Sequence, residues 1–403
     1  MESNICFLGG IFPEQLQSEI IEICGYIPQT ASDALEKNIL DGLTAHRGRS
    51  VKIFNTFFLP SHIRGIRKIK RTQWEQDGET HINIPFVYGK GIQHFSKYHS
   101  IVREMRSFLK QHRGEKTKLI VYSAYFPFLM AVTKLKRQFD LDVCLVVADL
   151  PEYMGLQSKK SLYHRVSVKV SSHLFHKHNR SADRYVFLTE HMNEVLNPDR
   201  KPYTVVEGIA NRRYITYPEV QRAPKRLLYS GTMQNRYGIP TLLKAIQQIP
   251  DSDAQFVFYG NGEAAKAVEE AAQTDTRIHY YAEINRERLF WEQQAATVLV
   301  NPRPNTDAFT KYSFPSKILE YMLSGNPVIA YKLDGVPSEY DAYILYPQDT
   351  SVEKLAEKIQ EVFRMSPQQR VQIGERAKCF AFEQKNYLIQ TQKILDVFNS
   401  NGR

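Results

Sequence analysis

Short apolar runs alternate with helix-length segments along the second half of the chain. Runs rich in β-branched and aromatic residues occupy 227–229, 256–259, 278–281, 298–300 and 328–330. Between them, apolar residues recur at helical spacing after Pro240 and again over 316–324, where Gly325 is placed to end the helix. Strands that alternate with helices predict a parallel sheet with helices on both faces.

The first half repeats this alternation with longer insertions. The pattern predicts strands at 5–8, 51–58, 119–122, 143–147 and 185–188, and helices at 32–43, 99–111 and 128–138. Ser32 is the expected N-cap of the first helix. The predicted fold class is therefore α/β, with two doubly wound, Rossmann-like domains facing a cleft. We place these domains at 1–206 and 207–380, and expect a C-terminal helix at 381–403 to cross back to the first.

Composition narrows the class of protein. The 403 residues are 42% hydrophobic and 24% charged, which excludes a disordered or fibrous chain. The four cysteines stand singly, so neither a disulfide framework nor a zinc site is expected, and a reducing cytoplasm fits best. The sequence has no apolar run of membrane-spanning length, and Glu2 stands where a signal peptide carries positive charge. We expect a cytoplasmic protein.

Basic residues gather in the first half of a chain whose net charge is +10. Two clusters, 64–71 and 159–184, attract polyanions or form a solvated surface, and the residues favour neither alternative. The segment 162–178 is modestly amphipathic, which is compatible with an anionic membrane surface, although packing on its own domain is the commoner explanation. Because no recognised nucleic-acid-binding module accompanies the charge, we expect no nucleic-acid partner.

The segment 311–330 carries the most informative chemistry. Lys317 falls in the first turn of a predicted helix, where the helix dipole disfavours a cation. Together with Ser316 and the backbone N–H groups of the helix start, it predicts a site for a phosphate. Glu320 lies one turn further along and is able to accept hydrogen bonds from sugar hydroxyls. The alternative is an ordinary lysine–glutamate pair on the surface.

Two glycine turns follow predicted strands at the same edge of the second sheet. The first, with Gly231 and Thr232, leads to Arg236 and a helix start, so that backbone and guanidinium are able to approach a diphosphate. The second contains Gly260 and Asn261, for which a plain turn is the simpler interpretation. Arg303, after the fourth strand, adds a guanidinium to this rim.

Two positions of the first half are further candidates. Gly10 follows the first strand and either admits a ligand closely or makes a tight turn. Asp149 lies just past a strand end, where it is equally suited to be a general base or to form an Asx turn or a helix cap.

These features together resemble the family 4 retaining glycosyltransferases, which have the GT-B architecture of two Rossmann-like domains. The resemblance rests on residues 227–238, 256–262, 295–303 and 314–330, with weaker similarity at 182–189 and 205–209. It covers most of 180–345 and, loosely, the whole chain. The stretch 312–317 is most similar to bacterial capsule, O-antigen and exopolysaccharide transferases.

The resemblance implies roles for individual residues. The family's E-x7-E pair contacts the donor, and Glu320 matches the second glutamate, which binds the nucleotide ribose. Tyr312 stands in place of the first, so Ser313 or neighbouring backbone takes over the sugar contact. Arg236 and Lys317 match the basic pair on the diphosphate, although Thr232 replaces an arginine found in many members. With Asp149, they are the expected catalytic residues. The expected donor site comprises Gly10, Gly231, Thr232, Gly260, Asn261, Arg303, Ser313, Ser316 and Glu320.

The implied function is retaining transfer of a sugar from a nucleotide-diphospho-sugar to a glycan, with a polyprenyl-diphosphate-linked acceptor, in cell-surface polysaccharide synthesis. Neither a metal nor a cofactor is expected, since fixed positive groups are able to stabilise the leaving diphosphate. The protein then works in the cytoplasm, at the inner face of the membrane. Two alternatives stay open: a nucleotide-sugar epimerase, and a catalytically silent GT-B subunit, to which Tyr312 points.

Overall fold

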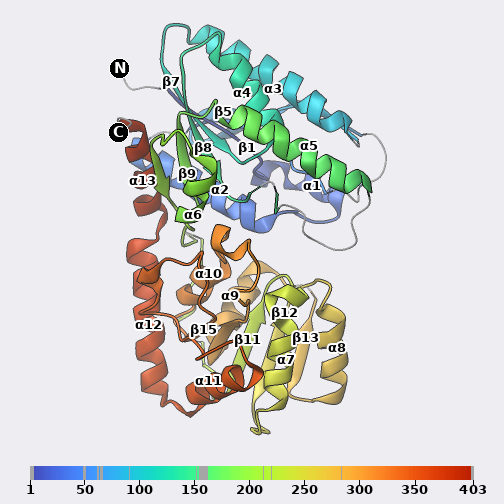
Figure 1. Ribbon diagram of the computed structural model, residues 1–403, viewed down its shortest axis with the longest axis vertical. Helices are drawn as coiled ribbons and strands as arrows, with labels where there is room; N and C mark the ends of the chain where they lie inside the picture. The colour runs from blue at the N-terminus through green and yellow to red at the C-terminus, as the bar shows by residue number, and fades with distance from the viewer. Residues whose placement is uncertain are drawn as a thin grey trace. The chain divides into compact units, whose positions relative to one another are not determined.

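The computed structural model describes residues 4–48, 51–60, 63, 67–89, 91–150, 152–153, 162–211, 213–218, 220–282 and 284–400 (Figure 1). The chain forms two compact units. Unit 1 comprises residues 1–209 and 387–403, and unit 2 comprises residues 210–386. The predicted basic clusters lie in part outside the described residues, which omit 64–66 and 159–161.

Unit 1 is built on a sheet whose described strands follow the order β10-β9-β8-β7-β1-β2-β5-β4. All neighbours in it are parallel except β4 and β5, which are antiparallel. Strand β1 has β2 on one side and β7 on the other, so the strand order reverses there. The strands are β1 (Asn4–Gly9), β2 (Lys52–Asn55), β4 (Thr72–Gln76), β5 (Glu79–Asn83), β7 (Thr117–Tyr122), β8 (Leu141–Val147), β9 (Arg184–Phe187) and β10 (Tyr203–Val205).

Helices cover both faces of this sheet. Figure 1 shows α3, α4 and α5 side by side on one face, while α13 packs against α2, β9 and β10. A separate antiparallel pair, β3 (Arg67–Ile69) with β6 (Phe86–Tyr88), shares a small core with α1. The helices are α1 (Gln17–Cys24), α2 (Thr30–Arg47), α3 (Ile92–Gln111), α4 (Phe126–Lys136), α5 (Leu162–Asn179), α6 (Glu190–Leu196) and α13 (Tyr387–Asn399).

Unit 2 contains a parallel sheet with described strands in the order β13-β12-β11-β14-β15. Here the order reverses at β11, between β12 and β14. Helices α7, α8 and α11 bury apolar side chains on one face, and α9, α10 and α12 on the other. The elements are β11 (Arg226–Ser230), α7 (Ile239–Gln247), β12 (Gln255–Tyr259), α8 (Ala265–Thr274), β13 (Ile278–Tyr281), α9 (Arg286–Ala295), β14 (Val298–Asn301), α10 (Lys317–Leu323), β15 (Val328–Ala330), α11 (Val352–Arg364) and α12 (Pro367–Gln384).

The α/β fold with parallel sheets is confirmed, as are all five strands predicted for the second half. Gly325 ends α10 in the left-handed conformation, with φ +73°. Ser32 was wrong as the N-cap of α2, which begins at Thr30, and its hydroxyl instead donates to Tyr122 Oη. Helix α3 begins at Ile92, earlier than the predicted residue 99. The pair β3 and β6 was not predicted, because the charged residues at 67–71 hide the strand pattern of β3.

Within the described residues, no helix combines the length and apolarity needed to cross a membrane.

Candidate functional site

The carboxyl edge of the unit 2 sheet is shaped by two glycine turns in direct contact. Gly231 follows β11, and its N–H donates to Tyr259 O of β12. Gly260 has φ +135°, and a Cβ there would stand 2.0 Å from Gly231 O. A third glycine, Gly238, leaves no room for a Cβ beside Pro302 O, at 1.9 Å. The loops after β11, β12 and β14 therefore pack backbone against backbone, which only glycine permits.

Lys317 lies directly over this glycine turn. Its Cε is 3.6 Å from the position of a Cβ on Gly231, and its Nζ is 3.1 Å and 3.2 Å from the two carboxylate oxygens of Glu320. Both side chains are partly buried. The lysine–glutamate pair anticipated as the simpler interpretation is therefore present, but it lies at the sheet edge rather than on an open surface.

Glu320 is held by several hydrogen-bond donors. Burial alone would raise the pKa of its carboxyl, but Lys317, a hydrogen bond from Gln293 and the charge of Arg286 outweigh burial and lower that pKa. Gln293 Nε2 donates to Glu320 Oε1 at 2.7 Å, and its Oε1 is 3.4 Å from Tyr214 Oη. The site therefore keeps Glu320 ionised and oriented, as an acceptor of hydrogen bonds.

Two arginines flank one pair of aromatic rings beside this edge. The guanidinium carbons of Arg236 and Arg303 lie 5.1 Å and 4.5 Å from the ring centre of Phe309, and both lie 5.5 Å from that of Tyr237. Arg303 is only 6% exposed, and its Nη1 is 3.4 Å from Ser313 Oγ. Arg236 is more accessible and donates to Gln234 Oε1. Of the two, Arg236 is the guanidinium better placed to meet a ligand.

The remaining residues predicted for the donor differ in accessibility. Thr232, Asn261 and Ser316 are exposed, and Tyr312 is partly buried in a short 3-10 turn that precedes α10. All of them belong to unit 2, with Lys317 and Glu320. The structure thus brings most of the predicted donor set to one unit, around the carboxyl edge of its sheet.

Gly10 and Asp149 belong to unit 1. A Cβ on Gly10 would meet the ring of Phe58 at 2.2 Å, and the Gly10 N–H donates to Glu36 Oε2 at 2.8 Å. Tight packing therefore accounts for this glycine without a ligand. Asp149 is exposed just past the end of β8.

Three polar residues of these edges were not predicted from the sequence. Gln293 orients Glu320, and Tyr321 Oη, fully buried, accepts a hydrogen bond from Ser230 N and donates one to Ser230 O. Glu36 is fully buried in unit 1. In the sequence, each of these residues interrupts the apolar face of a helix. That interruption indicates a buried polar group, but it does not indicate which residue the group contacts.

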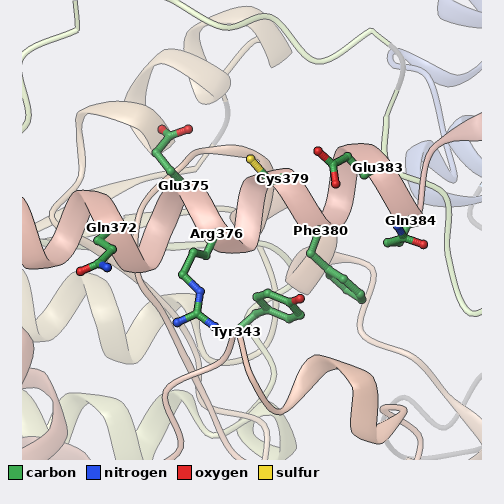
Figure 2. A pocket seen from close by; sticks show the side chains of 8 residues that line it. All are labelled: Tyr343, Gln372, Glu375, Arg376, Cys379, Phe380, Glu383 and Gln384. Atoms are coloured by element: carbon green, nitrogen blue, oxygen red, sulfur yellow. The ribbon is translucent and has the colours of Figure 1, made fainter.

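A shallow hollow of about 460 Å³ lies elsewhere in unit 2, along α12 (Figure 2). Tyr343 and Phe380 stack at its floor with ring centres 4.4 Å apart, and Cys379 is exposed at its rim. None of the residues predicted for the donor site lines it.

Among the described residues, no group of three or more histidine, cysteine, aspartate or glutamate side chains is arranged to hold a metal ion. Lys317 and Arg236 are two accessible cations of the unit 2 edge.

Residues 224–365, which form most of unit 2, match the sequence model of the family described as Glycosyl transferases group 1. No curated protein matches the chain in sequence.

Solved structures match over almost the whole chain. Sucrose-phosphate synthase from Thermosynechococcus elongatus is 16% identical over 98% of each chain, with a TM-score of 0.67. HepE from Anabaena in complex with UDP is 13% identical over 99% of this chain and 100% of that one, with a TM-score of 0.63. WaaG, a glycosyltransferase involved in lipopolysaccharide biosynthesis, is 18% identical over 98% and 100%, with a TM-score of 0.61.

The fold is therefore GT-B. Within unit 2, residues 224–365 are similar to the group 1 glycosyl transferases.

Proposed function

We propose that this protein is a retaining glycosyltransferase that uses a nucleotide-diphospho-sugar and resembles family 4 in its donor site. The observation that carries the proposal is the Lys317–Glu320 pair lying against Gly231, inside the segment that matches the group 1 domain. A cation and an ionised acceptor within one helical turn suit a diphosphate and a ribose, which lie next to each other in a nucleotide-diphospho-sugar. HepE and TarM, both similar in fold, were solved with UDP.

In the proposed reaction, unit 2 binds the donor and unit 1 the acceptor. An acceptor hydroxyl oxygen forms a bond to the anomeric carbon of the sugar, and its proton passes to Asp149. The bond from that carbon to the diphosphate breaks, so negative charge develops on the leaving diphosphate. Lys317 and Arg236 stabilise that charge, so transfer needs no divalent cation. Glu320 orients the ribose, and Ser313 or nearby backbone contacts the sugar in place of the glutamate that Tyr312 replaces. Asp149, exposed after β8, is the proposed acceptor-side catalytic carboxylate.

The proposed acceptor is a lipid-linked glycan at the inner face of the cell membrane, in the synthesis of a surface polysaccharide such as a capsule, O-antigen or exopolysaccharide. Helix α5 supports the membrane part of this proposal. Its side chains Val166 and Val170 are 53% and 50% exposed, beside the exposed cations Lys169 and Lys177. An exposed face that mixes apolar and basic residues suits anionic headgroups.

Thermal unfolding with UDP, GDP, ADP or CMP tests the donor site without knowledge of the acceptor. A nucleotide that binds the folded protein raises the melting temperature by mass action. We expect one of the four to do so, and Lys317→Ala to weaken its binding about 10- to 100-fold, because a charge-assisted contact is lost. The matched control is Lys332→Ala, which removes an exposed lysine of the same unit that pairs with Asp341.

The alternatives give different results in the same experiment. A shift that survives in Lys317→Ala would remove Lys317 from the donor site. No shift with any nucleotide at millimolar concentration would favour a catalytically silent GT-B subunit, the reading to which Tyr312 points. An epimerase would isomerise the sugar nucleotide when no acceptor is present, which incubation with the donor alone detects.

A further inference from the structure

Helix α12 is held on unit 2 by one face and exposes the other. Its buried residues include Gly374, Ala377 and Ala381. A Cβ on Gly374 would stand 2.0 Å from Gly325 O, so the backbone of α12 lies in close contact with the turn after α10. A capping box closes the first turn of the helix. Helix α12 is therefore a rigid scaffold for the side chains of its outer face.

Four exposed residues follow the outer face of this helix at intervals of four, three and four positions. They are Gln372, Arg376, Cys379 and Glu383, and we name them the α12 stripe. At this spacing their side chains share one side of an α-helix. Figure 2 shows them along the length of α12. The stripe is separate from the donor residues, which lie at the carboxyl edge of the sheet.

The stripe carries one positive and one negative charge, on Arg376 and Glu383. They are seven residues apart, about 10 Å along the helix axis, which is too far for them to pair within α12. Among the described residues, neither side chain forms an ion pair or a hydrogen bond. The neighbouring Glu375, by contrast, lies 3.9 Å from Arg222. Two opposite charges are thus left without counter-charges on one exposed helix face.

A second copy of the same helix, laid antiparallel, supplies both counter-charges at once. If a two-fold axis passes midway between Arg376 and Glu383, each arginine meets the glutamate of the other copy. Every contact of such an interface occurs twice, because the two surfaces are identical. A parallel pair in register would instead place arginine opposite arginine and glutamate opposite glutamate. The charges of the stripe therefore favour the antiparallel arrangement.

Apolar surface flanks the stripe on both sides. On one side, Val371 and Phe382 are 38% and 39% exposed. On the other side lies the hollow of about 460 Å³, where the rings of Tyr343 and Phe380 stack. Residues two apart point about 200° apart around a helix, so Phe382 and Phe380 lie on opposite flanks. Because exposed ion pairs contribute little by themselves, burial of this apolar surface must supply most of the affinity of a contact here.

We propose that two copies of this chain associate through antiparallel α12 helices, with reciprocal ion pairs between Arg376 and Glu383. The self-complementary charges are the reason to assign a second copy as the partner, since each copy holds what the other lacks. The inference goes beyond the proposed function and does not depend on it. A single pair of helices buries less surface than a standard interface, so we expect a weak, reversible dimer.

Sedimentation velocity on the full chain, at concentrations up to about 100 μM, measures the dimer. We expect Arg376→Glu to weaken dimerisation about tenfold or more, because both ion pairs become repulsive contacts. The double variant Arg376→Glu with Glu383→Arg exchanges the two charges and should restore it. Phe382→Ser, which removes exposed apolar surface, should also weaken it. The matched control is Lys266→Glu, a charge reversal at a position of α8 whose side chain is 83% exposed.

Chemical cross-linking gives an independent reading of the same contact. Cys379 is exposed and lies next to the proposed two-fold axis, whereas Cys6, Cys24 and Cys144 are buried. A short bismaleimide should therefore join two copies through Cys379 and give a covalent dimer on a denaturing gel. Cys379→Ser should give none.

The outcomes decide the proposal in either direction. A dimer that Arg376→Glu weakens, that the exchange of both charges restores and that Lys266→Glu leaves intact supports it. A monomer at every concentration overturns it. A dimer that tolerates Arg376→Glu and Phe382→Ser also overturns it, because such a dimer uses another surface. Recovery in the double variant shows that the loss in Arg376→Glu comes from charge and not from misfolding.

Discussion

The carboxyl edges of the two sheets are built to the same topological plan but with opposite electrostatics. In unit 2 the edge presents Lys317, Arg236 and an ionised Glu320, whereas in unit 1 the corresponding place holds Glu36 and Lys97 buried among apolar and aromatic groups. In unit 2, Lys317 and Glu320 pair with each other, Gln293 also donates to Glu320, and Arg236 donates to Gln234 Oε1. The same topology therefore carries different charges in the two units, so the local side chains and not the topology set the electrostatics of each edge.

The close backbone contact between Gly260 and Gly231 gives the largest expected effect on stability. We expect Gly260→Ala to lower the free energy of unfolding of unit 2 by about 4 kcal/mol, from left-handed strain and a Cβ 2.0 Å from Gly231 O. Urea titration of the full chain measures it. In the control Gly78→Ala the glycine is also left-handed but has nothing within 4 Å, so about 1 kcal/mol is expected. Similar losses in both would mean that backbone contact does not shape this edge.

The protonation of Lys97 gives the next largest expected effect, which is on the pH dependence of the free energy of unfolding. Its pKa is about 7 in the folded protein, below that of an unfolded lysine, so the unfolded chain binds the additional proton between these two values. Stability must therefore rise with pH over that window. We expect the free energy of unfolding of the wild type to gain about 3 kcal/mol over Lys97→Met between pH 7 and pH 9.5. Urea midpoints at the two pH values measure this gain.

The control for Lys97 is Lys110→Met, at an exposed position of the same helix. It should show no such gain. If the free energies of unfolding of the wild type and of Lys97→Met change equally with pH, Lys97 stays fully charged in the folded protein. The two sheet edges would then not differ in the charge of their buried groups.

Much of this architecture was readable in the sequence, because buried parallel strands are short apolar runs with glycine turns after them. That pattern located β11 to β15 and placed Gly231, Lys317 and Glu320 near one sheet edge. The charge states of the buried groups in unit 1 could not be predicted in the same way. A single lysine or glutamate usually lies at the surface, and in unit 1 burial by segments distant in the sequence shifts its pKa.

Lys97 did leave one signal in the sequence. It shares its helical face with Ile101 and Met105, both buried, so the apolar stripe of α3 passes through a lysine. The aromatic partners of that lysine come from segments near residues 58, 86 and 125. No local pattern predicts that these segments converge, since strand order in the sheet brings them together.

The protonation state of the buried Glu36 carboxyl gives the third prediction. A carboxyl whose pKa is raised on folding contributes stability that is complete below its unfolded pKa and is lost as pH rises through the folded one. Glu36→Gln carries no ionisable group, so its stability should not show this loss. We expect the variant to gain stability on the wild type as the pH rises from 4 to 8, measured by urea unfolding. The control Glu22→Gln, at an exposed position of α1, should not alter the pH dependence of the free energy of unfolding. The same pH dependence in both variants would show that Glu36 is charged in the folded protein.

Salt dependence gives the smallest effect and separates the two edges most directly. Raising the ionic strength from 0.1 to 1 M shortens the Debye length from about 10 to about 3 Å, which screens attraction between accessible charges. Nucleotide affinity, measured by calorimetry, should therefore fall about tenfold, because Lys317 and Arg236 meet a diphosphate at a partly exposed edge. The stability difference between the wild type and Lys97→Met should change much less with salt, because the Lys97 amine is buried and buried charges are screened less than accessible ones. A nucleotide affinity that stays constant with salt would show that Lys317 and Arg236 do not meet the diphosphate, and the electrostatic contrast between the two edges would then say nothing about the donor.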